Sequence, residues 1–129
     1  MAGRYLLDTN IVIALFDSDP RVQARLAASE EILLSSVVLG ELWYGAMNSG
    51  NPPANLAKLE GFAASCRSIG IDDETARTYD SIKADLRKSG RPIPENDLWI
   101  AASARQHGLV LVTRDGHFDT VEQLTIERW

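Results

Sequence analysis

Four acidic residues stand where an expected strand ends or close to where an expected helix begins, although they are scattered over most of the chain: Asp8, Glu41, Asp97 and Asp115. In a parallel α/β sheet, ligands gather beyond the carboxyl ends of the strands. The first turns of the helices that follow those strands lie at the same edge. We therefore expect the four side chains to converge, and Asp8 in particular, set between two apolar runs, needs a cation, donors or water as a partner.

Four carboxylates in one pocket would repel one another and raise each other's pKa unless a positive charge lay among them. A hard divalent cation solves this problem, and oxygen ligands without a His or Cys cluster favour Mg²⁺ or Mn²⁺ over zinc. Such an ion keeps several waters and binds phosphate oxygens. The residues therefore suggest hydrolysis of a phosphodiester by a metal-activated water.

The elements that must position these acids are short apolar runs with helix-like segments between most of them. The runs are 5–7 (YLL), 32–34 (ILL), 68–71 (SIGI), 109–113 (LVLVT) and 124–129 (LTIERW). Runs without polar alternation suit strands that are covered on both faces, and strand, helix, strand repetition indicates parallel pairing. We predict an α/β fold: one domain over residues 1–129, with a parallel sheet flanked by helices.

Helix starts are marked by capping residues. Asp19 before Pro20 predicts the start of a helix, a Ser at 35 or 36 can cap the next, and Asp72 can cap a long helix from 73 to about 89. A further helix is expected over 95–107.

Two finer predictions concern the middle of the chain. In the helix from 73, one face is expected to carry Ala76, Tyr79, Ile82 and Leu86. The stretch 51–53 (NPP) is expected to form the main mid-chain loop.

Composition limits the function classes. The chain has 129 residues, 45% of them hydrophobic and 24% charged, and it has one cysteine, Cys66. No leader-like segment and no apolar run near the roughly 20 residues of a membrane span is present, so we expect a cytoplasmic protein with no membrane role. The net charge of −5 argues against nucleic-acid binding unless the acids are concentrated at a metal site.

Four stretches together resemble the acidic signatures of PIN-domain nucleases, in order and spacing: LLDTN at 6–10, SSVVLGELWYG at 35–45, NDLWIAASA at 96–104 and LVTRDGHF at 111–118. The likeness spans essentially the whole chain and is nearest to the VapC toxins of bacterial toxin–antitoxin pairs. It implies a Mg²⁺-dependent endoribonuclease, with Mn²⁺ able to substitute, in which Asp8, Glu41, Asp97 and Asp115 are catalytic and hold the metal.

The same resemblance implies supporting roles and partners. Asn10 would order the loop after the first strand, and Thr113 would supply a hydroxyl near the last acid. It also implies the strand order 3-2-1-4-5, a homodimer, an RNA substrate and a cognate VapB-like antitoxin. From their position, Arg87, Arg91, Arg114 and His117 are candidate RNA contacts.

Several alternatives stay open at this level. Each acid has a purely structural reading: Asp8 as a helix cap, Asp97 as a first-turn acid, Glu41 as a solvated residue and Asp115 as a turn former. Two further acids, Glu95 and Asp119, are rival ligands, although we expect them to be surface acids.

The rival functions are a catalytically silent PIN-fold scaffold that binds RNA or protein, and a metal-dependent phosphatase that acts on small esters. The apolar residues Leu42, Trp43, Tyr44 and Met47 are expected to form core and a subunit interface, with an antitoxin groove as the alternative.

Overall fold

The computed structural model describes residues 3–129 and has a central five-stranded sheet. All strand pairs are parallel and the strand order is β3-β2-β1-β4-β5, as predicted. The strands are β1 (Arg4–Leu7), β2 (Glu31–Ser35), β3 (Arg67–Ile69), β4 (Val110–Val112) and β5 (Ile126–Glu127). Every strand therefore points its carboxyl end toward the same edge.

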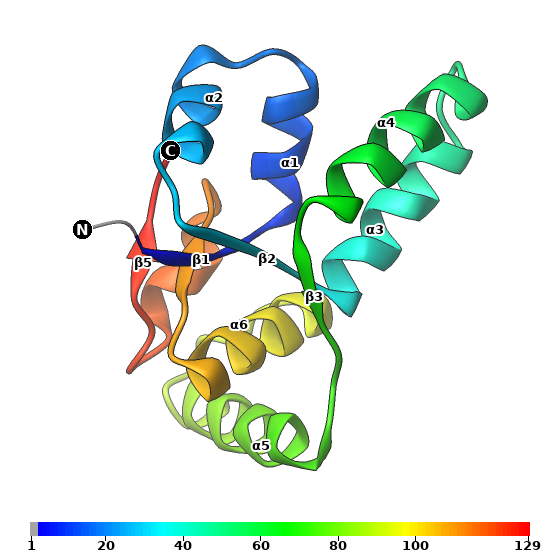
Figure 1. The fold of residues 1–129 in the computed structure, drawn as a ribbon. Coiled ribbons are helices and arrows are strands. Elements are labelled where there is room, and N and C mark those ends of the chain that lie inside the picture. The colour runs from blue at the N-terminus through cyan, green and yellow to red at the C-terminus, as the bar shows by residue number, and fades with distance from the viewer. Residues whose placement is uncertain (1–2) are drawn as a thin grey trace.

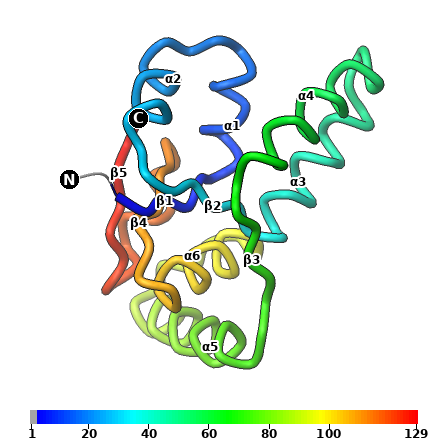
Figure 2. Tube along the Cα trace, in the orientation of Figure 1, coloured from blue at the N-terminus to red at the C-terminus, as the bar shows by residue number. Residues whose placement is uncertain are grey.

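Six α-helices and one short 3₁₀ helix surround this sheet: α1 (Thr9–Phe16), α2 (Pro20–Ala27), α3 (Ser36–Met47), α4 (Pro52–Ala64), α5 (Asp73–Lys88), α6 (Glu95–His107) and η1 (Gly116–Thr120). Figure 1 shows α1 and α2 on one side of the sheet and α5 and α6 on the other. Helices α3 and α4 form a hairpin arm that extends from the body (Figure 2). The core lies between these layers, where Leu6, Leu33 and Leu111 of the central strands are at most 1% exposed.

The predicted helix starts are confirmed. Asp19 caps α2 through two backbone N–H groups, Ser35 caps α3, and Asp72 forms a capping box with Thr75 at the start of α5. Each cap satisfies donors that a helix leaves free in its first turn. The caps of α3 and α5 fix where the chain leaves β2 and β3, and the cap of α2 fixes the turn that follows α1.

The prediction of a loop at 51–53 was wrong. Asn51 accepts a hydrogen bond from the backbone N–H of Ala54, and Pro52 occupies the first turn of α4. Proline is favoured there because the N–H it lacks would have no helical partner. The same Asn or Asp followed by Pro therefore starts both α2 and α4.

The predicted buried face of α5 was wrong at one position. Ile82 and Leu86 are buried, but Thr75 is fully buried in place of Ala76, which is exposed. The Thr75 hydroxyl both takes part in the cap with Asp72 and contacts the side chain of Gln106 on α6. These contacts satisfy the hydroxyl, so a polar residue can occupy the interface with α6.

Trp43, Tyr44 and Met47 were expected to form core and a subunit interface, and the core part of this prediction was wrong. Tyr44 is 72% exposed, and Trp43 and Met47 are exposed as well, whereas Leu42 is buried. Ile13 of α1 is another exposed large apolar residue. Within residues 3–129, no helix is long and apolar enough to cross a membrane.

Candidate metal site at the carboxyl edge

Asp8 lies directly after β1 and is almost fully buried, with 5% exposure. Its backbone N–H donates to the carbonyl of Val112 at the end of β4, with 2.9 Å between N and O. Its carboxylate caps α1 by accepting from the Thr9 N–H at 2.8 Å. Asp8 is therefore a helix cap, one of the roles that the sequence allowed. It can also contribute to a metal site at the carboxyl edge, because its second carboxylate oxygen has a different partner.

That second oxygen connects the ends of β1 and β4. The hydroxyl of Thr113 donates to Asp8 Oδ2 at 2.8 Å and accepts from the backbone N–H of Asp115 at 3.0 Å. Asn10 adds a longer contact of 3.4 Å to Asp8 Oδ2, and its own side-chain oxygen accepts from the Arg114 N–H at 3.2 Å. Asn10 and Thr113 thus hold the two loops that carry Asp8 and Asp115 in a fixed relation.

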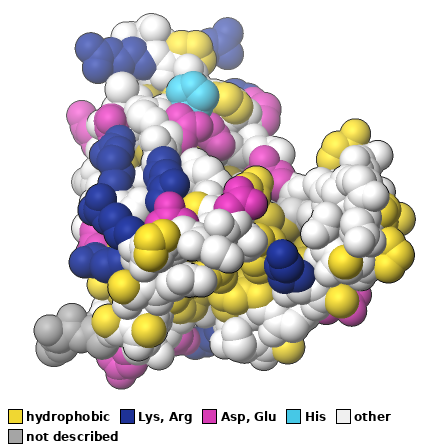
Figure 3. Space-filling model, turned by 90° about the horizontal axis from the view of Figure 1, so that it is seen from above, with side chains coloured by type: hydrophobic (Ala, Val, Ile, Leu, Met, Phe, Trp, Pro, Cys, Tyr) yellow, Lys and Arg dark blue, Asp and Glu magenta, His cyan; other side chains and the backbone are white. Residues whose placement is uncertain are grey.

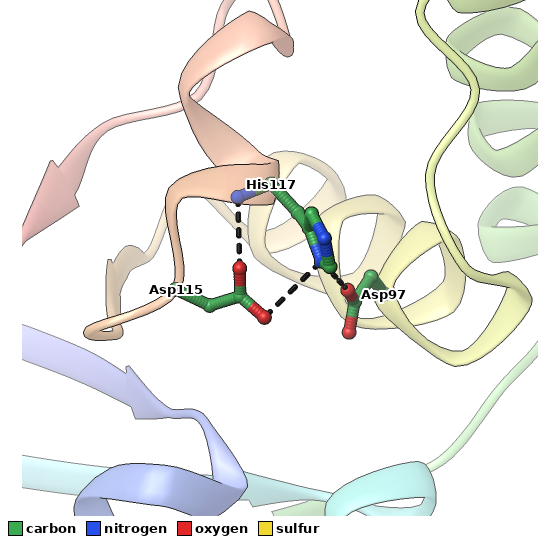
Figure 4. A group of neighbouring side chains, drawn as sticks. All are labelled: Asp97, Asp115 and His117. Atoms are coloured by element: carbon green, nitrogen blue, oxygen red, sulfur yellow. Dashed lines mark hydrogen bonds and ion pairs between the residues drawn. The ribbon is translucent and has the colours of Figure 1, made fainter.

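Asp97 and Asp115 come together around His117 (Figure 4). His117 Nδ1 lies 3.1 Å from Asp97 Oδ2 and 3.2 Å from Asp115 Oδ2. One ligand atom from each of the three residues falls within 4.8 Å of the other two. Their side chains are 15%, 35% and 53% exposed for Asp97, Asp115 and His117, so the group faces solvent and is open to a ligand.

Glu41 lies in the second turn of α3 and accepts a hydrogen bond from the Thr9 hydroxyl at 2.9 Å. It lines a cleft of about 640 Å³ whose other lining residues include Thr9, Tyr44 and Asn96, the neighbour of Asp97. Glu41 therefore stands at the wall of an open cleft on the same edge as the other acids.

Burial raises the pKa of the Asp8 carboxyl above its ordinary value. Hydrogen bonds from Thr113 and Thr9 oppose this effect, whereas the negative charges of Asp97 and Glu41 add to it. Because charge repulsion of this kind requires proximity, Asp8 is electrostatically coupled to acids from α3 and α6.

Burial is also the largest cause of the raised pKa of Asp97. The contact with His117 lowers this pKa, and the charges of Asp115 and Glu41 raise it. These charge effects link Asp8 with Asp97 and Glu41, and Asp97 with Asp115 and Glu41. Of the four acids, Asp97 and Asp115 lie in the tight group with His117.

The donor chemistry fits a divalent cation. Carboxylate oxygens are the ligands that hard ions prefer, and a cation would stabilise the ionised forms that burial and repulsion disfavour. Asp97 and Asp115 would hold such an ion directly, with Asp8 and Glu41 as the adjoining acids.

The two rival acids are engaged elsewhere, as expected of surface acids. Glu95 pairs with Lys83 at 2.7 Å and contacts the Tyr79 hydroxyl. Asp119 pairs with Arg128 at 2.7 Å.

The candidate RNA contacts differ in availability. The guanidinium of Arg114 is bound to Asp19 and to the carbonyl of Trp129, both at 2.8 Å. Arg87 and Arg91 are exposed, and Arg91 lines a hollow of about 560 Å³ together with Lys88 and Arg105. Sequence reasoning placed His117 against a phosphate and missed its contacts with Asp97 and Asp115. The spacing of two residues between Asp115 and His117 in a short turn was the available signal.

A parallel sheet in this order, with acids at its carboxyl edge, defines the class of fold and site found in PIN domains, and the PIN domain family model matches residues 5–124. "Ribonuclease VapC2" of Haemophilus influenzae is 37% identical over 129 residues, covering 98% of both chains. The "tRNA(fMet)-specific endonuclease VapC" of Shigella flexneri shows the same identity and coverage. Among solved structures, VapBC2 from Rickettsia felis, bound to a DNA fragment from the promoter, superposes with a TM-score of 0.91 at 30% identity and 98% coverage of each chain. The chain belongs to the VapC ribonuclease family of PIN domains.

Proposed function

We propose that this protein is a Mg²⁺-dependent endoribonuclease and the toxin of a VapBC-type toxin–antitoxin pair. The observation that carries the proposal is the convergence of Asp97 and Asp115 at the carboxyl edge, beside the buried Asp8 and the cleft-lining Glu41. A scaffold has no use for a group of acids that repel one another, so a catalytic role is favoured over a silent PIN module.

Each acid has a distinct task in the proposed reaction. A bound divalent ion would supply positive charge for the phosphate oxygens and lower the pKa of an attacking water. Asp97 and Asp115 would hold the divalent ion. Asp8, whose carboxylate is fixed by Thr113, would add negative charge close to it. Glu41 lines the cleft and is placed to orient the water and accept its proton. Asn10 acts by holding the loop after β1 against the loop after β4.

RNA must reach an acidic protein through local positive charge. Lys88, Arg91 and Arg105 line one hollow near η1, the element that carries His117; Asp85 and Glu122 also line it, and Arg105 donates to the Glu122 carbonyl. We assign the RNA backbone to this side, with Arg87 as a further contact and Arg114 as a structural ion pair. Because the net charge is −5, binding of RNA without the divalent ion is expected to be weak.

The proposed protein partners are a VapB-like antitoxin and a second copy of this chain. Structures of related VapBC complexes, including one of DNA-bound VapBC from Salmonella typhimurium with a TM-score of 0.90 and 31% identity, support an antitoxin partner. An apolar groove of about 220 Å³ between α1, α3 and α4 borders Thr9 and Glu41. Figure 3 shows exposed apolar side chains in the hollow beside the α3–α4 arm, where a partner would cover them.

The test is cleavage of purified transfer RNA by the isolated protein. Initiator transfer RNA is the first substrate, with an elongator transfer RNA beside it and EDTA or Mg²⁺ in parallel reactions. Asp97→Asn should abolish cleavage, whereas Glu95→Gln, on the same helix but paired with Lys83, should retain it. Cleavage that persists in EDTA would overturn metal dependence. Absence of RNA cleavage with hydrolysis of a nitrophenyl phosphate would favour the phosphatase instead.

A further inference from the structure

The imidazole of His117 has a place in the acid cluster that its exposure alone does not explain. Its side chain is 53% exposed, yet Nδ1 points back between two carboxylates instead of outward. Figure 4 shows the ring between Asp97 and Asp115, which come from α6 and from the loop after β4. The two carboxylates hold the ring in this orientation through Nδ1, so the imidazole belongs to the acid cluster and is not a free surface side chain.

We propose that His117 Nδ1 is a direct ligand of the divalent ion, so that this site prefers Mn²⁺ to Mg²⁺. This inference rests on the proposed function, since it assumes that Asp97 and Asp115 hold a metal. It adds a nitrogen donor to an otherwise all-oxygen ligand set.

The distances fit neighbouring ligands of one ion. In an octahedral site with bonds of about 2.1 Å, adjacent ligand atoms lie about 3.0 Å apart. The two separations from Nδ1 are 3.1 Å to Asp97 Oδ2 and 3.2 Å to Asp115 Oδ2. An ion would bind the lone pair of Nδ1 in the tautomer that carries its hydrogen on Nε2, and any proton on Nδ1 would pass to solvent as the ion enters, with little movement of the side chains.

The surrounding contacts hold this arrangement in place before an ion binds. The backbone N–H of His117 donates to Asp115 Oδ1 at 2.9 Å, which leaves Asp115 Oδ2 directed at the ring. Phe118, the next residue, is fully buried and anchors η1 to the core. Preorganised ligands of this kind reduce the entropy lost on binding.

The choice of metal follows from ligand chemistry. Imidazole nitrogen is a common ligand of first-row transition metals, whereas Mg²⁺ favours oxygen ligands and keeps several of its waters. Mg²⁺ would therefore bind through the carboxylates with water in the place of the imidazole. Mn²⁺ would gain the additional ligand.

The chain offers a matched control because it has two histidines, His107 and His117. His107 is exposed in the last turn of α6, ten residues after Asp97 and therefore about 15 Å further along the helix axis. Substitution of His107 by Gln removes an imidazole without touching the acid cluster.

The experiment measures the Mn²⁺-loaded protein by electron spin echo envelope modulation, which detects a directly bound ¹⁴N nucleus. The wild type and His107→Gln should show imidazole nitrogen coupling, and His117→Gln should lose it. Calorimetry should show the Mn²⁺ dissociation constant of His117→Gln raised about tenfold or more, with Mg²⁺ affinity nearly unchanged. Urea unfolding in EDTA checks that the three proteins are equally folded.

Two results would overturn the inference while leaving the proposed function intact. The first is Mn²⁺ bound by the wild type without nitrogen coupling, which makes the ligand set carboxylate only. The second is RNA cleavage with Mg²⁺ by a protein that does not bind Mn²⁺. A protein that binds neither ion and cleaves no RNA would overturn both.

Discussion

The hydroxyl of Thr113 is one of the connections between the loops of Asp8 and Asp115, beside Asn10, and it can be removed without changing side-chain shape. Thr113 is fully buried, and its Oγ1 donates to Asp8 Oδ2 and accepts from the Asp115 N–H. Thr113→Val replaces the hydroxyl with a methyl group of similar size. The substitution therefore tests the hydrogen bonds and leaves packing nearly unchanged.

The magnitude follows from these two bonds. A hydrogen bond to a charged group contributes about 1.5–3 kcal/mol, and a partly buried N–H left without an acceptor costs about 1 kcal/mol more. We expect Thr113→Val to lower the free energy of unfolding by about 2.5–4 kcal/mol near neutral pH in EDTA. Cleavage and metal affinity should fall as well, because Asp8 and Asp115 lose their common support.

The loss should depend on pH with a defined sign. The bond from Thr113 lowers the pKa of Asp8, so its removal raises that pKa further above the ordinary 3.8. The penalty is fully present above the folded-state pKa of Asp8 and shrinks as pH falls through it, because the protonated carboxyl has less to lose. Urea titrations from about pH 8 down to about pH 4, close to the ordinary value of the carboxyl, measure this trend.

The control is Thr78→Val, which removes an exposed hydroxyl bonded to the Glu74 carbonyl at 3.0 Å within α5. Its effect should stay within about 0.5 kcal/mol. If Thr113→Val cost no more than this control, or the same at every pH, the hydroxyl would not be supporting an ionised Asp8.

Three other predictions concern the same fold. Asp8→Asn should abolish RNA cleavage yet raise the urea midpoint in EDTA at neutral pH, since burial raises the pKa of this carboxyl; a lowered midpoint would contradict that account. For the metal-free wild type, stability should fall as pH rises through the raised pKa values of Asp8 and Asp97, and a divalent ion at one hundred times its dissociation constant should restore about 2.7 kcal/mol, measured by thermal unfolding. In thermal unfolding, Gly108→Ala should lower the free energy of unfolding by about 1–2 kcal/mol, because this glycine has a φ of 63°. Gly61→Ala within α4 has open space around it and should raise the free energy of unfolding by about 0.5–1 kcal/mol.

The strands and most helix starts were predictable because their signals are local. Asp19 with Pro20, and Asp72 before a long helix, act through backbone groups within three residues, so sequence alone identifies them. The start of α4 at Pro52 carried the same signal, but proline next to a second proline was interpreted as a loop. The burial of Thr75 was not predictable, because it depends on Gln106, which lies 31 residues away in the chain.

The acids of the site were predictable for a different reason. Parallel strands place their following residues at one edge, and the strand order implied by the family resemblance made β1 and β4 neighbours, so Asp8 and Asp115 were expected to lie near each other. Which carboxylates share the tightest group is decided by side-chain rotamers and by the turn of η1. The sequence could not show that Asp97 would meet Asp115 through His117 while Asp8 turned toward Thr113.

The cost of the site explains why a polar triplet interrupts the apolar run at Asp8. A carboxylate with 5% exposure is disfavoured in its charged form, and hydrogen bonds from Thr9 and Thr113 offset this only in part, since its pKa remains raised. A fold selected for stability alone would place a neutral cap such as Asn or Ser at this position. Under the proposed function, a carboxylate is kept there because its negative charge favours a bound cation, and binding would recover the stability lost by the metal-free chain. The Asp8→Asn variant therefore tests folding, metal affinity and catalysis through one residue at this edge of the sheet.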